Sequence, residues 1–164
     1  MDSMLWRHRR RVKLSPVGDR AHDPGVPAWT CPGCGRQFGR HGQSHSCVPA
    51  VPVPAYLGGL TPGQRAICGA VLSHLDGRDP VVVDAVGVGI LVKRQRTFAE
   101  LRPARSRMVL SFILSRGIDH VRVRRRLRLS RHRYAHFVDL YSAGDVDDEV
   151  RCWLSEAYES SPAD

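Results

Sequence analysis

The chain has 164 residues, of which 42% are hydrophobic, and this length and composition fit one compact domain with a small additional module. No apolar run approaches the roughly 20 residues that a membrane-spanning helix needs, and the basic N-terminus lacks the apolar core of a secretory signal. We therefore expect a cytoplasmic protein. In a reducing compartment its five cysteines, three of them clustered, favour metal binding over disulfides.

The formal net charge is +9, and it is distributed unevenly along the chain. Residues 1–133 hold 24 Lys and Arg against 8 acids, whereas residues 134–164 hold one Arg and 8 acids. Such a chain can bind polyanions through its basic part, or its acidic end can fold back onto that part. Because 23 of the 25 basic residues are Arg, a GC-rich genome would also explain this composition without any phosphate binding.

The first two segments of the chain differ sharply in composition. Residues 1–28 mix Arg, Pro, Gly and Asp without apolar periodicity and predict a flexible basic arm. Residues 29–48 follow as a predicted zinc finger, which opens on a Cys-x-x-Cys turn typical of zinc knuckles. A closed Cys₃His set favours one structural zinc ion, because a catalytic zinc keeps one position open. The predicted ligands are Cys31, Cys34, His45 and Cys47.

Two alternatives stay open for this finger. His41 also has a spacing that zinc would accept, although the pattern favours His45 as the fourth ligand. A redox Cys-x-x-Cys is the other alternative, but such a pair normally opens a helix after a strand. Here Pro and Gly accompany the pair and a third cysteine lies close by.

A second module follows the finger. Three prolines predict a stiff, non-helical linker over residues 49–60. A helix is then predicted to begin with a capping box, in which Thr61 is the N-cap, Pro62 takes the first helical position and Gln64 closes the box. Gly77 is expected to end this helix.

Short apolar runs separated by turn residues predict strands over residues 80–86, 88–94, 95–103, 107–115, 120–130 and 134–140. An amphipathic helix is expected last, with Asp145 as its N-cap and acids in its first turn. The connections are too short for parallel crossovers. We therefore predict an α+β domain over residues 61–160, an antiparallel sheet of about five or six strands flanked by two helices.

Arginines alternate with apolar residues along the predicted strand 120–130. Val121, Val123, Leu127 and Leu129 should share one face, and four arginines the other, with Arg125 as a bulge or strand end. Alternate side chains on a strand lie roughly 6.8 Å apart, which suits successive phosphates. The candidate contacts to DNA or RNA are Arg36, Arg40, Arg122, Arg124, Arg126, Arg128, Arg131 and Arg133. No aromatic residues are interleaved with these arginines as stacking platforms.

Other functions fit the same sequence. The arginine face can instead be a solvated surface, or a partner for the acidic C-terminal helix. The protein is then an adaptor that binds another protein, with a purely structural zinc finger. A third alternative is a small hydrolase, in which His136 acts as a general base beside the acids of residues 147–149. Groups of this kind more often tie a strand to the following helix.

Two motifs resemble those of an uncharacterised bacterial family. The first is W-x-CP-x-CGR-x-F continuing to Q-x-HSC, and the second is R-Y-x-H followed by DVDDE and WL-x-EAY. Together they span residues 29–158. The resemblance implies a finger followed by an α+β domain of unknown function. Because relatives of that domain sometimes follow nuclease-like domains, it also implies a nucleic-acid context.

Overall fold

A computed structural model describes residues 29–38, 41–42, 45, 47, 49–94 and 96–161. The predicted basic arm, residues 1–28, lies outside the described residues, as does Arg40. Among the described residues, no helix is both long enough and apolar enough to cross a membrane.

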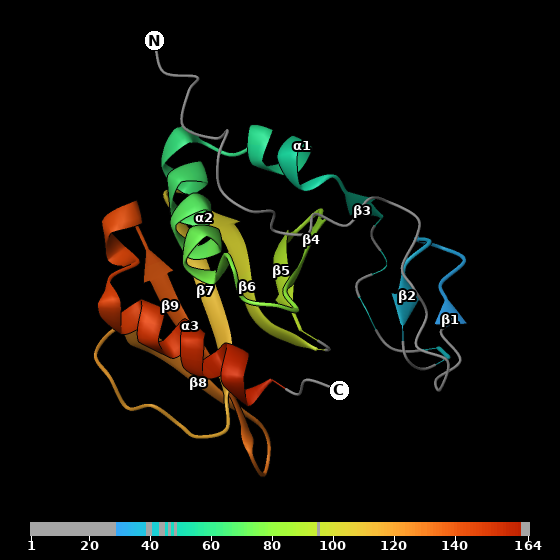
Figure 1. The fold of residues 1–164 in the computed structure, drawn as a ribbon. Coiled ribbons are helices and arrows are strands. Elements are labelled where there is room, and N and C mark those ends of the chain that lie inside the picture. The colour runs from blue at the N-terminus through green and yellow to red at the C-terminus, as the bar shows by residue number, and fades with distance from the viewer. Residues whose placement is uncertain are drawn as a thin grey trace.

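The elements follow one another along the chain as Figure 1 shows. The short strands are β1 (Trp29–Thr30), β2 (Gln37–Phe38) and β3 (Ala50–Val51). The longer strands are β4 (Val82–Val86), β5 (Gly89–Lys93), β6 (Thr97–Ala104), β7 (Arg107–Leu114), β8 (Val123–Ser130) and β9 (Arg133–Leu140). The helices are α1 (Val53–Gly58), α2 (Pro62–Leu75), the 3-10 helix η1 (Ala143–Asp145) and α3 (Asp148–Ser160).

The longer strands form an antiparallel sheet, which confirms the predicted α+β fold. Its order is β3-β4-β5-β6-β7-β9-β8, with the two-residue β3 at one edge and β8 at the other. Helices α2 and α3 pack side by side on one face, here called the helix face (Figure 1). No helix of the described residues covers the opposite face, here called the open face (Figure 1).

The hydrophobic core lies between the helix face and the two long helices. Strand β7 alternates between half-buried and buried residues, because a period of two sends every second side chain toward the helices. Its buried side chains are Met108, Leu110, Phe112 and Leu114, as the alternation predicts. The helices contribute the buried residues Ile67, Cys68, Val71, Leu75, Val150, Trp153, Leu154 and Ala157.

Helix α2 begins as the sequence predicts. The Thr61 hydroxyl accepts a hydrogen bond from the backbone N–H of Gln64 at 3.3 Å, and the Gln64 side chain accepts one from the Thr61 N–H at 3.2 Å. Two N–H groups without a partner inside the helix are thereby satisfied. The helix ends at Leu75, and Gly77 follows at φ +82°, a left-handed conformation that favours glycine.

The predicted linker is not uniformly extended. Residues 50–51 form β3 and pair with β4, and residues 53–58 form helix α1. The exclusion of helix from this segment was therefore wrong. Pro54 lies in the first turn of α1, where the missing N–H would have no partner inside the helix, so proline is tolerated there.

The last helix begins two residues later than predicted. Asp145 accepts hydrogen bonds from the N–H groups of Tyr141 and Ser142 at 2.7 and 2.9 Å, and so stabilises η1. Asp147 is the N-cap of α3, and its carboxylate accepts from the N–H of Val150 at 3.1 Å. The sequence has acids at both positions, and only the turn between β9 and α3 decides which of them caps the helix.

Candidate metal site and basic surface

The Cys-x-x-Cys turn is closed by backbone hydrogen bonds between β1 and β2. The Cys31 N–H donates to the Arg36 carbonyl at 3.0 Å, and the Gly35 N–H donates to the Cys31 carbonyl at 2.8 Å. Gly35 has φ +68°, a conformation that a side chain would strain. The turn therefore holds both cysteine sulfurs on one side of a tight loop.

The four predicted ligands come together. Their donor atoms all lie within 4.8 Å of one another, in a group made of Cys31, Cys34, His45 and Cys47. The Cys31 and Cys47 Sγ atoms are 3.6 Å apart, and Cys34 Sγ lies 3.5 Å from His45 Nε2. A zinc tetrahedron with bonds of about 2.3 Å has edges of about 3.8 Å, so this group can hold a metal ion. His41 is not in the group, and its ring centroid lies 5.3 Å from that of Trp29.

Packing and hydrogen bonding around the sulfurs suit thiolate ligands. A Cβ atom at Gly33 would lie 2.8 Å from Cys47 Sγ, so only glycine allows this close approach. Burial raises the pKa of Cys31, but hydrogen bonds from the backbone of Gly33 and Cys34 and from neighbouring thiols outweigh it and lower the pKa to about 6. The hydrogen bond to Cys31 is the main cause that raises the pKa of Cys47 to about 11. Of Cys31 and Cys47, Cys31 is therefore the one that ionises first.

The strand arginines do not share one face. A register shift between Val123 and Arg125 confirms the predicted bulge. Beyond the bulge, Arg126 pairs with His136 on the helix face, whereas Arg125 pairs with Phe137 on the open face. The extra residue changes which face each later side chain occupies.

The apolar residues of the predicted strand do not share one buried face either. Val121 precedes β8 and is 94% exposed, and Leu129 is 50% exposed. Only Val123 of this strand packs against the core, so the prediction of one apolar and one basic face was wrong. The reason is that β8 is the edge strand, while α2 and α3 pack mainly on the central strands β6 and β7.

The acidic residues of α3 and of the turn before it pair with the loop before β8 rather than with β8 itself. The Arg122 guanidinium donates to the Asp147 carboxylate at 2.7 Å and to the Asp145 carbonyl at 2.7 Å. Arg122 is therefore held by the chain's own acids. Among the described residues, no carboxylate of α3 pairs with the arginines of β8. Two further pairs join the same loop to α3: His120 with Glu149 at 3.1 Å and Arg116 with Glu156 at 2.7 Å.

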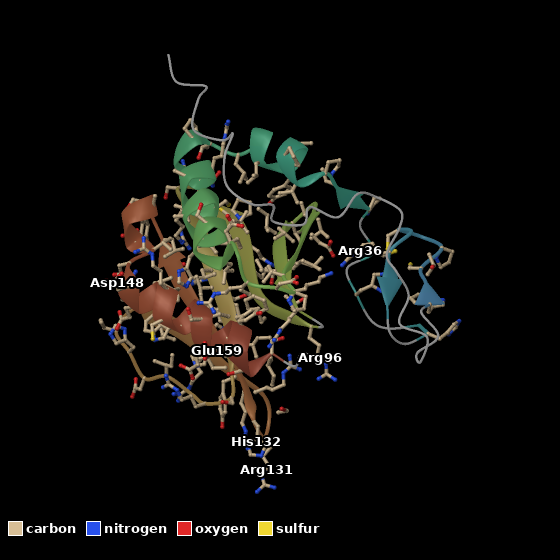
Figure 2. The ribbon with its side chains drawn as sticks, in the orientation of Figure 1. Arg36, Arg96, Arg131, His132, Asp148 and Glu159 are labelled. Carbon is tan, nitrogen blue, oxygen red and sulfur yellow. The ribbon has the colours of Figure 1, made fainter. Side chains whose placement is uncertain are left out.

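Basic residues gather at the end of the sheet formed by the β8–β9 hairpin. Arg131 and His132 project from the tip of this hairpin. Arg96, which precedes β6, lies at the same end of the sheet (Figure 2). A cavity of about 140 Å³ lies at this end, and its basic lining residues are Arg96, His132 and Arg133. The other polar lining residues carry hydroxyl groups: Thr97, Ser115, Ser160 and Ser161. No acidic residue of the described part of the chain lines this cavity.

Arg36 lies apart from this hairpin. It belongs to the finger, which adjoins β3 at one edge of the sheet, while the hairpin includes β8 at the other edge (Figure 2). Arg36 and the arginines of the hairpin, all named as candidate contacts to nucleic acid, therefore do not form one continuous surface. The basic end defined by the hairpin stands as a separate candidate site.

A family model described as Domain of unknown function (DUF5655) matches residues 62–161, more than half of the chain. The chain belongs to the DUF5655 family. The matched region begins with α2 and contains all six long strands and α3, so the finger lies outside it. No curated protein and no solved structure matches the chain.

Within the DUF5655 domain, His136 is a core residue. It is 0% exposed, its Nε2 accepts a hydrogen bond from the Ile118 N–H at 2.9 Å, and its ring stacks on Phe112 with centroids 5.3 Å apart. Burial lowers its pKa and keeps the ring neutral. A side chain so enclosed is not placed to act as the general base that the hydrolase alternative assigns to His136.

Sequence reasoning missed an aromatic residue on the open face of the DUF5655 sheet. Phe137 is half-buried, and the Arg125 guanidinium lies over its ring, 5.6 Å from the centroid. The alternation of residues 134–140 places Phe137 opposite His136, which was a sufficient signal for its face. The contact between Phe137 and Arg125 could not be predicted in the same way, because it depends on the register of β8 against β9.

Proposed function

We propose that this protein binds nucleic acid through the basic end of its DUF5655 sheet, and that its finger holds one structural zinc ion. The observation that carries the first part is the cavity at the β8–β9 hairpin. Its charged lining residues are all basic, and hydroxyl groups supply the rest of its polar lining. Guanidinium and hydroxyl donors suit phosphate oxygens.

The acidic helix does not neutralise this end. Its carboxylates pair with Arg116, His120, Arg122 and Arg151, which lie in the β7–β8 loop or in α3 itself. Glu159 is on the last turn of α3, near the basic end (Figure 2). Among the residues that the structure describes, it forms no ion pair with Arg96, Arg131 or Arg133. The positive charge at the hairpin is therefore available to an external polyanion.

The zinc proposal rests on donor number and spacing. Four donors fill a tetrahedral shell, and three of them are cysteine sulfurs, which zinc prefers. No position is left for a water nucleophile, so the ion would hold the knuckle together rather than perform chemistry. Native mass spectrometry should find one zinc per chain. Cys47→Ser should lose it, and His45→Ala should weaken binding more than His41→Ala. Stoichiometric zinc in Cys47→Ser would refute this ligand set.

Nucleic-acid binding is tested by fluorescence anisotropy of labelled oligonucleotides across a salt series. The test variant is Arg131→Ser combined with Arg133→Ser. The matched control is Arg65→Ser with Arg105→Ser, which removes the same charge from α2 and from the β6–β7 turn at the opposite end of the sheet. If two phosphate contacts are lost, the slope of log K against log salt should flatten by about 1.4 to 1.8 in the test variant only.

Two results would overturn the proposal. One is no binding to any oligonucleotide at about 50 mM salt, which would favour a protein-binding adaptor. The other is an equal loss in the test and control variants, because that would show a response to net charge rather than to a contact at the hairpin.

A further inference from the structure

The open face of the sheet is hollowed into a groove. Its volume is about 570 Å³, and its floor is built from β7 and β9. The floor residues are small or apolar, and Ile113, Ala135 and Phe137 are among them. They are half-buried or buried although no helix among the described residues covers them.

An aromatic ring with a cation over it forms part of this floor. The Arg125 guanidinium lies 5.6 Å from the Phe137 ring centroid. Proteins that bind single strands stack successive bases on aromatic side chains, and arginine adds a cation–π contribution. No aromatic residue alternates with the arginines along residues 120–130, but the fold brings Phe137 of the neighbouring strand next to Arg125.

The charged lining residues of the groove carry a net positive charge. They are Arg102, Arg124 and Arg125 against a single acid, Glu100. Arg102 is held by Glu100 at 2.7 Å, and Arg124 by Asp139 at 3.0 Å. The Arg102 and Arg124 side chains are 57% and 47% exposed, while their carboxylate partners are 19% and 20% exposed, so it is the guanidinium side of each pair that can reach a phosphate beside the groove. The charge of the groove complements a polyanion.

The groove adjoins the basic cavity at the hairpin. Both are lined by Thr97, Phe98 and Ile113, so the two hollows lie next to each other at this end of the sheet. Phe137 and Arg133 are four residues apart on β9, a distance of about 13 Å along the strand. An extended chain with a base on Phe137 can therefore place a following phosphate at the basic end.

We infer that the open face binds single-stranded nucleic acid, with a base that takes the place of the Arg125 guanidinium on the Phe137 ring and the backbone running toward the basic cavity. This rests on the proposed function and specifies its substrate class. A duplex keeps its bases stacked on one another, whereas a single strand offers free base faces to an aromatic side chain. The recessed position of Phe137 favours the single strand for the same reason.

The test compares a single-stranded oligonucleotide with its own duplex on the full chain. Phe137→Leu keeps an apolar side chain but removes the ring, and Phe137→Tyr keeps the ring as the matched control. Loss of one stacked base should weaken single-strand binding by about 5- to 150-fold in Phe137→Leu. Duplex binding and the salt slope should not change, and Phe137→Tyr should bind like the wild type. Thermal denaturation checks that both variants fold.

Photo-crosslinking of the wild-type protein provides a readout that no substitution can disturb. A single strand containing 5-bromouracil should crosslink to the β9 peptide that contains Phe137, as identified by mass spectrometry. Equal affinity for single strand and duplex, unchanged single-strand binding in Phe137→Leu, or crosslinks confined to the hairpin tip would each overturn this inference. In those cases salt-dependent binding through Arg131 and Arg133 would still stand. Absence of all binding would instead remove the proposed function.

Discussion

Replacement of His136 by Leu separates a structural histidine from a catalytic one. The Nε2 atom of His136 is the acceptor for the Ile118 N–H at 2.9 Å, and the ring stacks on Phe112. Leucine fills part of the same volume but accepts no hydrogen bond. The substitution should therefore destabilise the domain whatever substrate is present.

The magnitude follows from the two lost interactions. A buried N–H left without an acceptor costs about 1 to 3 kcal/mol. Loss of the aromatic contact costs about 0.5 to 1.5 kcal/mol more. His136→Leu should therefore lower the free energy of unfolding by about 1.5 to 4.5 kcal/mol at about pH 8, where the native histidine is neutral.

The pH dependence of the free energy of unfolding provides a second, independent test. Burial, with help from Arg126 and Arg116, lowers the pKa of His136 below its ordinary value of 6.5. Below pH 6.5 the unfolded chain binds a proton that the folded chain refuses, so wild-type stability falls as the pH drops toward the folded pKa. This histidine contributes a slope of up to about 1.4 kcal/mol per pH unit. His74, whose pKa burial also lowers, keeps its own contribution in the variant.

Urea denaturation of both proteins at about pH 8 and about pH 5 measures these quantities. The difference between wild type and variant should be largest at the higher pH and should shrink at the lower one. A variant within about 0.5 kcal/mol of wild type at pH 8 would refute the reasoning, because that is the effect of an ordinary surface substitution. An equal loss of stability in both proteins on acidification would refute the pKa argument.

Two further predictions concern the finger and the acidic helix. Gly33→Ala should weaken zinc binding in a competition titration, because its Cβ would lie 2.8 Å from Cys47 Sγ, whereas Gly63→Ala, with open space around it, should not; equal zinc affinity in both variants would contradict the crowding argument. Asp147→Ala should cost about 1 kcal/mol of unfolding free energy as a lost N-cap. Arg122 is the main cause that lowers the pKa of Asp147, against burial, which raises it. Wild-type stability from this group is therefore complete above pH 3.8 and falls as the pH drops through the lower folded pKa. Identical acid denaturation curves for wild type and Asp147→Ala would contradict this contribution.

Features that depend on neighbouring residues could be predicted from the sequence. The capping box of Thr61 and Gln64 is a contact over three residues, and the burial pattern of β7 follows from its period of two. The Cys₃His group of the finger is also local, since its spacing sets which donors can converge. For the same reason the α+β class was accessible, because short connections exclude parallel crossovers.

What only the tertiary structure decided is where the functional side chains point. Strand β8 lies at the edge beyond β9, and a single bulge changes the face of every arginine after it. The loop before β8 meets the first turn of α3, so Arg122 pairs with Asp147. Arg125 lies beside Phe137 of the neighbouring strand β9, on the same face of the sheet. Each of these contacts joins residues whose proximity depends on strand order and register. Neither is encoded in the spacing of the residues, because strand order is chosen by how all the strands and helices together bury the core.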